Sequence, residues 1–219
     1  SARIELAKHA GMQIMELVRR NIRPRDIMTA AAIRNALTAD MALGCSTNSM
    51  LHLPAIANEC GVDFNLDMAN EISAVTPNLC HLAPAGPTYM EDLNAAGGVY
   101  AVLKELTKKN LLDTSVMTVT GKTLGENLEE LKASGYYEKC DEYLAKTGCR
   151  RTDIIRSFDA PLGTDGSIAI LRGNLAPEGC VIKHTACPKA MFRATLTARP
   201  FDSEEEAIAS IYDGKIVPG

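Results

Sequence analysis

Residues 40–53, Asp40-Met-Ala-Leu-Gly-Cys-Ser-Thr-Asn-Ser-Met-Leu-His-Leu53, contain a turn between two apolar helical segments. The first apolar run ends at Gly44, and the polar cluster Ser46-Thr47-Asn48 opens the second. Glycine permits a turn that a residue with a Cβ resists, and Ser, Thr and Asn are the residues that cap helices. The first turn of a helix has free N–H groups and partial positive charge, which hold a carboxylate or phosphate. The alternative is a capped corner that binds nothing, as most caps do.

The sequence on both sides of this turn predicts further helices. Apolar residues between 4 and 18 recur at helical spacing until Pro24 ends the element, and Thr29 caps an alanine-rich helix to about Leu43. The helix after Ser46 reaches about Gly61. The remaining helical segments are a short helix from Asp67 to about 75, two pieces at 89–96 and 99–108 separated by a Gly-Gly pair, and one at 123–132.

Short strands are predicted between and after these helices. Residues 79–83 form a buried strand or extended segment, and the β-branched run 116–120 forms a strand. This alternation predicts a helix-rich α/β layer domain over residues 1–150. Beyond residue 150, turns with Pro and Gly separate short strands at 154–155, 167–171, 181–183 and 192–197, and a capping box at Ser203 opens a helix to about 212. We therefore predict a second, β-rich domain over residues 151–219.

Composition excludes two classes of partner. The chain has 219 residues, of which 46% are hydrophobic and 23% charged, as in ordinary globular proteins. A net charge of −4, with scattered Lys and Arg and no Trp, argues against a nucleic-acid surface. No apolar run approaches the roughly 20 residues that span a bilayer. We expect neither nucleic acid nor a membrane as a partner.

The cysteines give no sign of a metal site. There are seven, an odd number, and none forms a CxxC pair. Their spacing fits neither a zinc ribbon nor a disulfide scaffold, so we expect free thiols in a reducing cytosol or organelle matrix. For each one, a small buried apolar side chain is preferred over a ligand. The residues predict no metal ligand.

No catalytic residue is predicted either. Gly121-Lys122-Thr123 looks like part of a phosphate-binding P-loop, but the earlier glycine that this motif needs is replaced by Val116. Glu91 and Asp92 are adjacent, so on a helix they point about 100° apart and form no carboxylate pair. No Ser/His/Asp set is supported by the sequence.

Four blocks, in the same order, resemble the dihydroxy-acid dehydratase and 6-phosphogluconate dehydratase family. The first is the 44–48 segment, with Cys45 at a glycine of the family. The others are Pro84-Ala-Gly-Pro-Thr-Tyr-Met-Glu-Asp-Leu-Asn-Ala-Ala-Gly-Gly98, Thr118-Val-Thr-Gly-Lys-Thr-Leu-Gly-Glu-Asn127 and Leu171-Arg-Gly-Asn-Leu-Ala-Pro-Glu-Gly179. The resemblance runs over nearly the whole chain and implies an internal piece of a longer protein. This piece would hold part of the N-terminal α/β domain and the start of a C-terminal β-barrel-like domain.

The resemblance also implies a chemistry. Family members remove water from a 2,3-dihydroxy carboxylate to give a 2-keto acid. They use an iron–sulfur cluster as Lewis acid on the departing 3-hydroxyl, and a Mg²⁺ that holds the carboxylate and 2-hydroxyl. In the family, the metal ligands and the catalytic serine lie outside the region matched here. We therefore expect both cofactors in the full-length parent and none in this chain, which alone should be inactive.

Within the family, residues 90–93 and 118–127 resemble the branch that makes branched-chain amino acids. Its substrates are 2,3-dihydroxyisovalerate and 2,3-dihydroxy-3-methylvalerate, in valine and isoleucine biosynthesis. The resemblance further implies a homodimeric, cytoplasmic enzyme, and we expect Ser46, Thr47 and Asn48 to contact the substrate. The alternatives are a sugar-acid dehydratase of the 6-phosphogluconate type and an inactive scaffold or dimerisation fragment.

Overall fold

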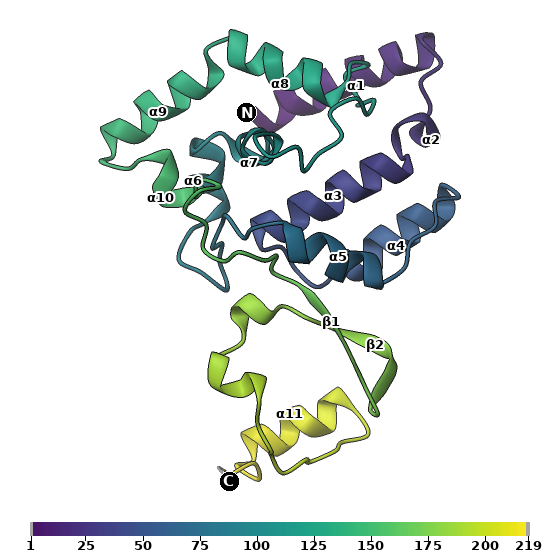
Figure 1. The fold of residues 1–219 in the computed structure, drawn as a ribbon, viewed down its shortest axis with the longest axis vertical. Helices are drawn as coiled ribbons and strands as arrows, with labels where there is room; N and C mark the ends of the chain where they lie inside the picture. Colours follow the sequence, from purple (N-terminus) through teal and green to yellow (C-terminus); the bar gives the residue numbers. More distant parts are fainter. Residues whose placement is uncertain (1, 218–219) are drawn as a thin grey trace. The chain divides into compact units, whose positions relative to one another are not determined.

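The structure is a computed structural model that describes residues 2–217. Within these residues it contains eleven α-helices, one small sheet and two short 3₁₀ segments (Figure 1). The chain forms two compact units, the first ending at Ala186 and the second beginning at Cys187. The helices of the first unit are α1 (Ala2–Arg19), α2 (Pro24–Ile27), α3 (Ala30–Leu43), α4 (Ser49–Glu59), α5 (Asp67–Val75), α6 (Met90–Ala95), α7 (Gly98–Thr107), α8 (Leu124–Ala133), α9 (Tyr136–Lys146) and α10 (Arg151–Ile154).

Helix α3 is the central element of the first unit because it contributes to both hydrophobic clusters. Leu37 and Met41, both fully buried, pack with apolar residues of α4, α5 and β1. Ala42 and Leu43 pack into the larger cluster, which is built mainly from α7, α8 and α9. Nine of the fourteen residues of α3 are buried. The C-terminal half of α3 is therefore held in place by packing on more than one side.

The predicted limits of α3 are confirmed. Thr29 Oγ1 accepts a hydrogen bond from the Ala32 N–H at 3.2 Å. Gly44 ends the helix in the left-handed conformation, with φ of 68°, and its N–H donates to the Asp40 carbonyl at 3.1 Å. The turn that the sequence predicts at Gly44 is thus present in the structure.

The only sheet within residues 2–217 is an antiparallel hairpin of β1 (Ala169–Gly173) and β2 (Ala176–Ile182). Ala169 pairs with Ile182 and Ile170 with Val181. The Asn70 side chain, on α5, donates to the Ile170 carbonyl at 3.0 Å and accepts from its N–H at 2.8 Å. The Asn70 amide thus pairs with both the N–H and the carbonyl of Ile170, on the edge of β1 that faces away from β2. These two bonds fix the hairpin against α5.

Three predicted strands are wrong. Residues 116–120 form a loop, because the hydroxyls of Thr118 and Thr120 bond to each other and to a helix side chain. Asn127 Nδ2, on α8, donates to Thr118 Oγ1, and Thr120 Oγ1 donates to Asn127 Oδ1. Residues 154–155 lie at the end of α10, which begins where the Arg150 N–H donates to the Asp153 carboxylate. Residues 192–197 follow the 3₁₀ segment Lys189–Phe192 and pair with no described strand.

The helix-rich α/β class is confirmed, with little sheet. The sequence did not predict helix α9. It did predict α11 (Glu204–Tyr212), which lies in the second unit. Ser203 caps α11 as expected, but the Glu206 carboxylate accepts from the Asp202 N–H instead of closing a box on Ser203. The boundary near residue 150 and the start of a barrel stay predictions. No helix among residues 2–217 is long and apolar enough to cross a membrane.

Candidate functional site

The polar corner, which we define as residues 44–49, is anchored by close packing of Gly44. A Cβ at this position would lie 3.1 Å from Asn78 Nδ2 and 3.2 Å from the Cys80 carbonyl oxygen. The extended segment at 78–80 also caps α3, because the Leu79 N–H donates to the Ala42 carbonyl at 2.8 Å. Asn78 Nδ2 adds bonds to the carbonyls of Ala42 and Cys80 at 3.3 and 3.2 Å. A side chain at Gly44 would therefore fit only if Asn78 or Cys80 shifted by a few tenths of an ångström.

Helix α4 begins later than the sequence suggested. Its N-cap is Asn48, whose side chain makes no capping bond, whereas Ser46 Oγ accepts from the Asn48 N–H at 3.2 Å. The prediction that the helix directly follows Ser46 is wrong, because three residues of turn lie between Cys45 and the start of α4 at Ser49. Ser46 caps that turn instead.

This turn leaves donors free at the start of α4. The N–H groups of Ser46 and Thr47 donate to no residue in the described part of the chain. The side chains of Ser46, Thr47 and Asn48 are all exposed. Backbone donors, two hydroxyls and an amide thus reach solvent together at the positive end of an eleven-residue helix. The structure brings the three predicted residues together and leaves open whether they bind a ligand.

A buried acid lies behind the corner. Asp40, on α3, is 8% exposed, and its Oδ2 accepts a hydrogen bond from Ser49 Oγ at 2.8 Å. Burial raises the pKa of the Asp40 carboxyl, while hydrogen bonds from Ser49 and Cys45 and the charge of Lys183 act in the opposite direction. Asp40 thus ties the last turn of α3 to the first residue of α4.

A lysine from far along the chain completes the corner. Lys183, which directly follows β2, donates from Nζ to the Gly44 carbonyl at 2.5 Å. It is the residue that the sequence analysis missed, because 139 positions separate it from Gly44 and no local motif marks it. Its ammonium adds positive charge beside the free donors of the turn.

The two thiols near the corner are largely shielded from solvent, and burial raises the pKa of each. Burial raises the pKa of Cys45 to about 12, and the neighbouring Asp40 carboxyl adds to the shift. Burial also raises the pKa of Cys80 to about 12. A cysteine binds a metal as the thiolate, and an iron–sulfur cluster needs several cysteine thiolates. Among residues 2–217, no three His, Cys, Asp or Glu side chains lie close enough to hold an ion together. The described residues therefore do not fit a cluster or a Mg²⁺ site.

Comparison with known proteins links both parts of the chain to one family. The family model described as "Dihydroxy-acid/6-phosphogluconate dehydratase N-terminal" matches residues 1–127, and its C-terminal counterpart matches residues 153–219. The chain is 57% identical to a dihydroxy-acid dehydratase of Clostridium kluyveri, 56% to one of Clostridium beijerinckii and 59% to one of Lachnoclostridium phytofermentans. Each alignment covers all of this chain and 36% of the relative. The chain thus spans about a third of the length of these relatives.

Proposed function

Because the chain belongs to the dihydroxy-acid/6-phosphogluconate dehydratase family, we propose that it is part of a dihydroxy-acid dehydratase, a hydro-lyase. The reaction removes water from 2,3-dihydroxyisovalerate or 2,3-dihydroxy-3-methylvalerate and gives the 2-keto acid. The observation that carries the proposal is an identity of 56–59% over the whole chain to enzymes named dihydroxy-acid dehydratase. The same names favour the branched-chain substrates over a sugar acid.

Within this enzyme, we propose that the polar corner binds the carboxylate of the substrate. The support is physical: the free N–H groups of Ser46 and Thr47, the exposed hydroxyls of both residues and the Asn48 amide are all able to donate to an anion. The nearby Lys183 ammonium favours negative charge at the same place. Donors held by a rigid turn orient a substrate at little entropic cost. The role of this chain would be to bind and orient the substrate, without transferring a proton.

The metal cofactors of the family would supply Lewis-acid chemistry at the departing hydroxyl and a hold on the substrate carboxylate. The described residues of this chain provide a ligand set for neither. We therefore expect those ligands in other parts of the longer protein. On the family resemblance alone, we also propose that the longer protein is a cytoplasmic homodimer, which sedimentation of the full-length protein would test.

The test is an assay of the full-length protein that contains this chain, loaded with its cofactors. We expect 2-keto acid to form from 2,3-dihydroxyisovalerate and not from 6-phosphogluconate. Replacing Thr47→Val together with Ser46→Ala should raise KM by roughly tenfold, since a hydrogen bond to a charged group is worth about 1.5–3 kcal/mol. The matched control is Ser134→Ala, an exposed hydroxyl at the end of α8, which should leave KM unchanged. Turnover of 6-phosphogluconate in place of the branched-chain acid would contradict the proposal.

A further inference from the structure

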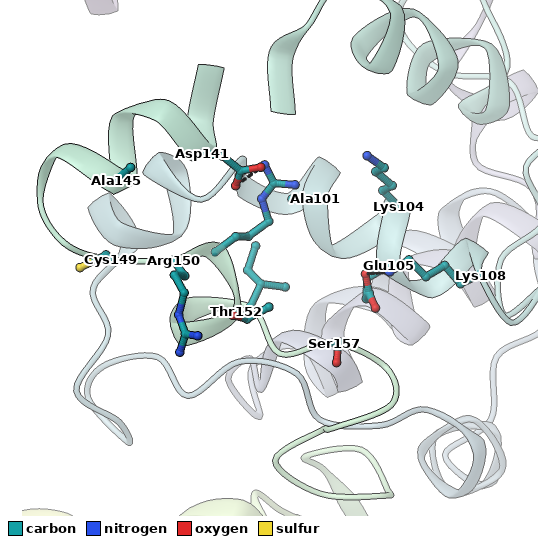
Figure 2. A pocket seen from close by; sticks show the side chains of 12 residues that line it. Ala101, Lys104, Glu105, Lys108, Asp141, Ala145, Cys149, Arg150, Thr152 and Ser157 are labelled. Carbon is teal, nitrogen blue, oxygen red and sulfur yellow. Dashed lines mark ion pairs between the residues drawn. The ribbon is translucent and has the colours of Figure 1, made fainter. Parts of the chain in front are cut away.

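A second polar site lies between α7, α9 and α10, away from the corner and sharing no residue with it. It is a cavity of about 470 Å³ (Figure 2). Four cations line it, together with two hydroxyl side chains: Lys104, Lys108, Arg150, Arg151, Thr152 and Ser157. Only two acids, Glu105 and Asp141, lie on its wall. The lining therefore has a surplus of positive charge.

The two acids are already engaged. Asp141 pairs with Arg151 at 2.9 Å, as the dashed line in Figure 2 marks. Glu105 pairs with Lys108 at 2.6 Å and also accepts the Phe158 N–H at 2.8 Å. Arg150 pairs with Asp153, at 2.9 Å, outside the lining. These pairings account for three of the four cations.

Lys104 is the cation left over. No carboxylate within residues 2–217 approaches its ammonium to 4.0 Å, and the ammonium lies 3.8 Å from the centre of the Tyr137 ring. Burial lowers the pKa of Lys104, and the charge of Arg151 lowers it further. Of the other charged groups around it, Lys132 and Lys108 act in the same direction and only Glu138 opposes them. Lys104 is thus a cation with too little negative charge around it.

The geometry around Lys104 is fixed by buried groups. Tyr137, which supports the ammonium, is 1% exposed. Its carbonyl accepts from Arg151 Nη2 at 2.5 Å, and the Arg151 guanidinium lies 5.3 Å from its ring. Both cations therefore lie against one buried aromatic ring, whose π-face attracts positive charge. No internal hydrogen bond occupies the hydroxyls of Thr152 or Ser157 within the described chain.

We propose that this basic pocket binds a dianionic phosphate group, either as inorganic phosphate or as the head of a small phosphate ester. Phosphate supplies the negative charge that the unpaired Lys104 lacks, together with acceptors for the Lys104 ammonium and the free hydroxyls. The cavity lies in the size range of small-molecule sites, about 300–1,000 Å³, which leaves space for an ester substituent beyond the phosphate. The site is independent of the proposed dehydratase activity, since it is formed wholly by residues of this chain outside the corner.

The test uses the whole 219-residue chain with ¹³C-labelled lysine, titrated with inorganic phosphate and, separately, with glycerol 3-phosphate. Sodium chloride at matched ionic strength is the control for screening. We expect saturable shifts of the Lys104 Cε signal and a rise in the Lys104 pKa on binding, because an added anion stabilises the ammonium. Tighter binding of the ester would identify an esterified ligand, and equal or tighter binding of inorganic phosphate would identify the free ion.

Two variants of Lys104 and one control variant make the outcome decisive. Lys104→Met should weaken phosphate affinity at least about tenfold, and Lys104→Arg should restore most of it, because Arg keeps the charge. Lys146→Met, an exposed lysine at the end of α9 outside the lining, is the matched control and should bind like wild type. The proposal is wrong if neither phosphate compound binds saturably, or if Lys104→Met and Lys146→Met bind equally well. Neither result would bear on the dehydratase proposal, which is measured by turnover.

Discussion

The polar corner at residues 44–49 and the basic pocket between α7, α9 and α10 are held in place by different forces. At the corner, backbone groups and a buried acid pack tightly, and a Cβ at Gly44 would force Asn78 or Cys80 to shift. At the basic pocket, two of the four cations, Lys104 and Arg151, lie against one buried ring, Tyr137, and the Arg150–Asp153 pair is largely solvent-exposed. Exposed ion pairs contribute about 0–1 kcal/mol each. The corner is therefore held by close packing, whereas two cations of the pocket are supported by one buried ring.

The first way to test this contrast is to remove the aromatic ring that supports Lys104 and Arg151. Tyr137→Ala should lower the free energy of unfolding by about 3–5 kcal/mol, because a large buried aromatic side chain leaves a cavity. Tyr143→Ala, on the same helix but 58% exposed, is the matched control and should change stability by no more than about 0.5 kcal/mol. Urea denaturation of both variants measures the difference. Equal effects would mean that Tyr137 is not the support of the pocket.

The second test places a methyl group at each of two left-handed glycines. Gly44→Ala should cost about 2–4 kcal/mol, the sum of the left-handed penalty and overpacking against Asn78 and Cys80. Gly148→Ala, between α9 and α10, has φ of 74° and no atom within 4 Å of the added Cβ. It should cost only about 1–2 kcal/mol. If thermal unfolding gave the same loss for both, packing at the corner would not be tighter than at the pocket.

A third variant removes the distant contact to the corner. Lys183→Met should destabilise the chain by about 1 kcal/mol, because the Gly44 carbonyl loses a charged donor. Lys146→Met serves as control, since that side chain is exposed. Denaturant midpoints of the two variants are compared. Identical midpoints would show that the contact between Lys183 and Gly44 adds nothing to the corner.

The smallest effect is a pH dependence at Asp40. Its carboxyl pKa is raised by burial, so the folded chain binds more protons than the unfolded chain above pH 3.8, and stability falls as pH rises through the folded pKa. Asp40→Asn cannot ionise, so its stability relative to wild type should improve between about pH 4 and pH 7. In the Lys183→Met background the wild-type slope should steepen, because that ammonium lowers the Asp40 pKa. A variant difference that does not change with pH would contradict this account.

The same contrast explains what the sequence could predict. The corner is local: Thr29, Gly44 and the polar cluster follow one another, so capping rules predicted α3 with both its limits. The start of α4 was misplaced because a serine that caps a turn looks the same in sequence as one that caps a helix. Residues 116–120 were misread because threonine suits both strands and hydroxyl-bonded loops.

The basic pocket and Lys183 had no such signal. The pocket assembles residues from 101 to 157, and only the packing of three helices around Tyr137 brings its cations together. Helix α9, one of the three, was not predicted at all. Lys183 reaches the corner only because the hairpin of β1 and β2 is fixed against α5 by Asn70. Contacts between positions this far apart depend on tertiary structure, which local patterns do not encode.

The central claim is that residues 46–48 hold the carboxylate of a dihydroxy acid or its keto product. The most direct measurement is a titration of the ¹⁵N-labelled chain with 2-ketoisovalerate, followed through its backbone amide signals. The account predicts saturable shifts concentrated at the amides of Ser46 and Thr47, which Thr47→Val with Ser46→Ala weakens and Ser134→Ala does not. No saturable shift at these amides, or equal shifts throughout the chain, would contradict it and leave the corner a structural turn.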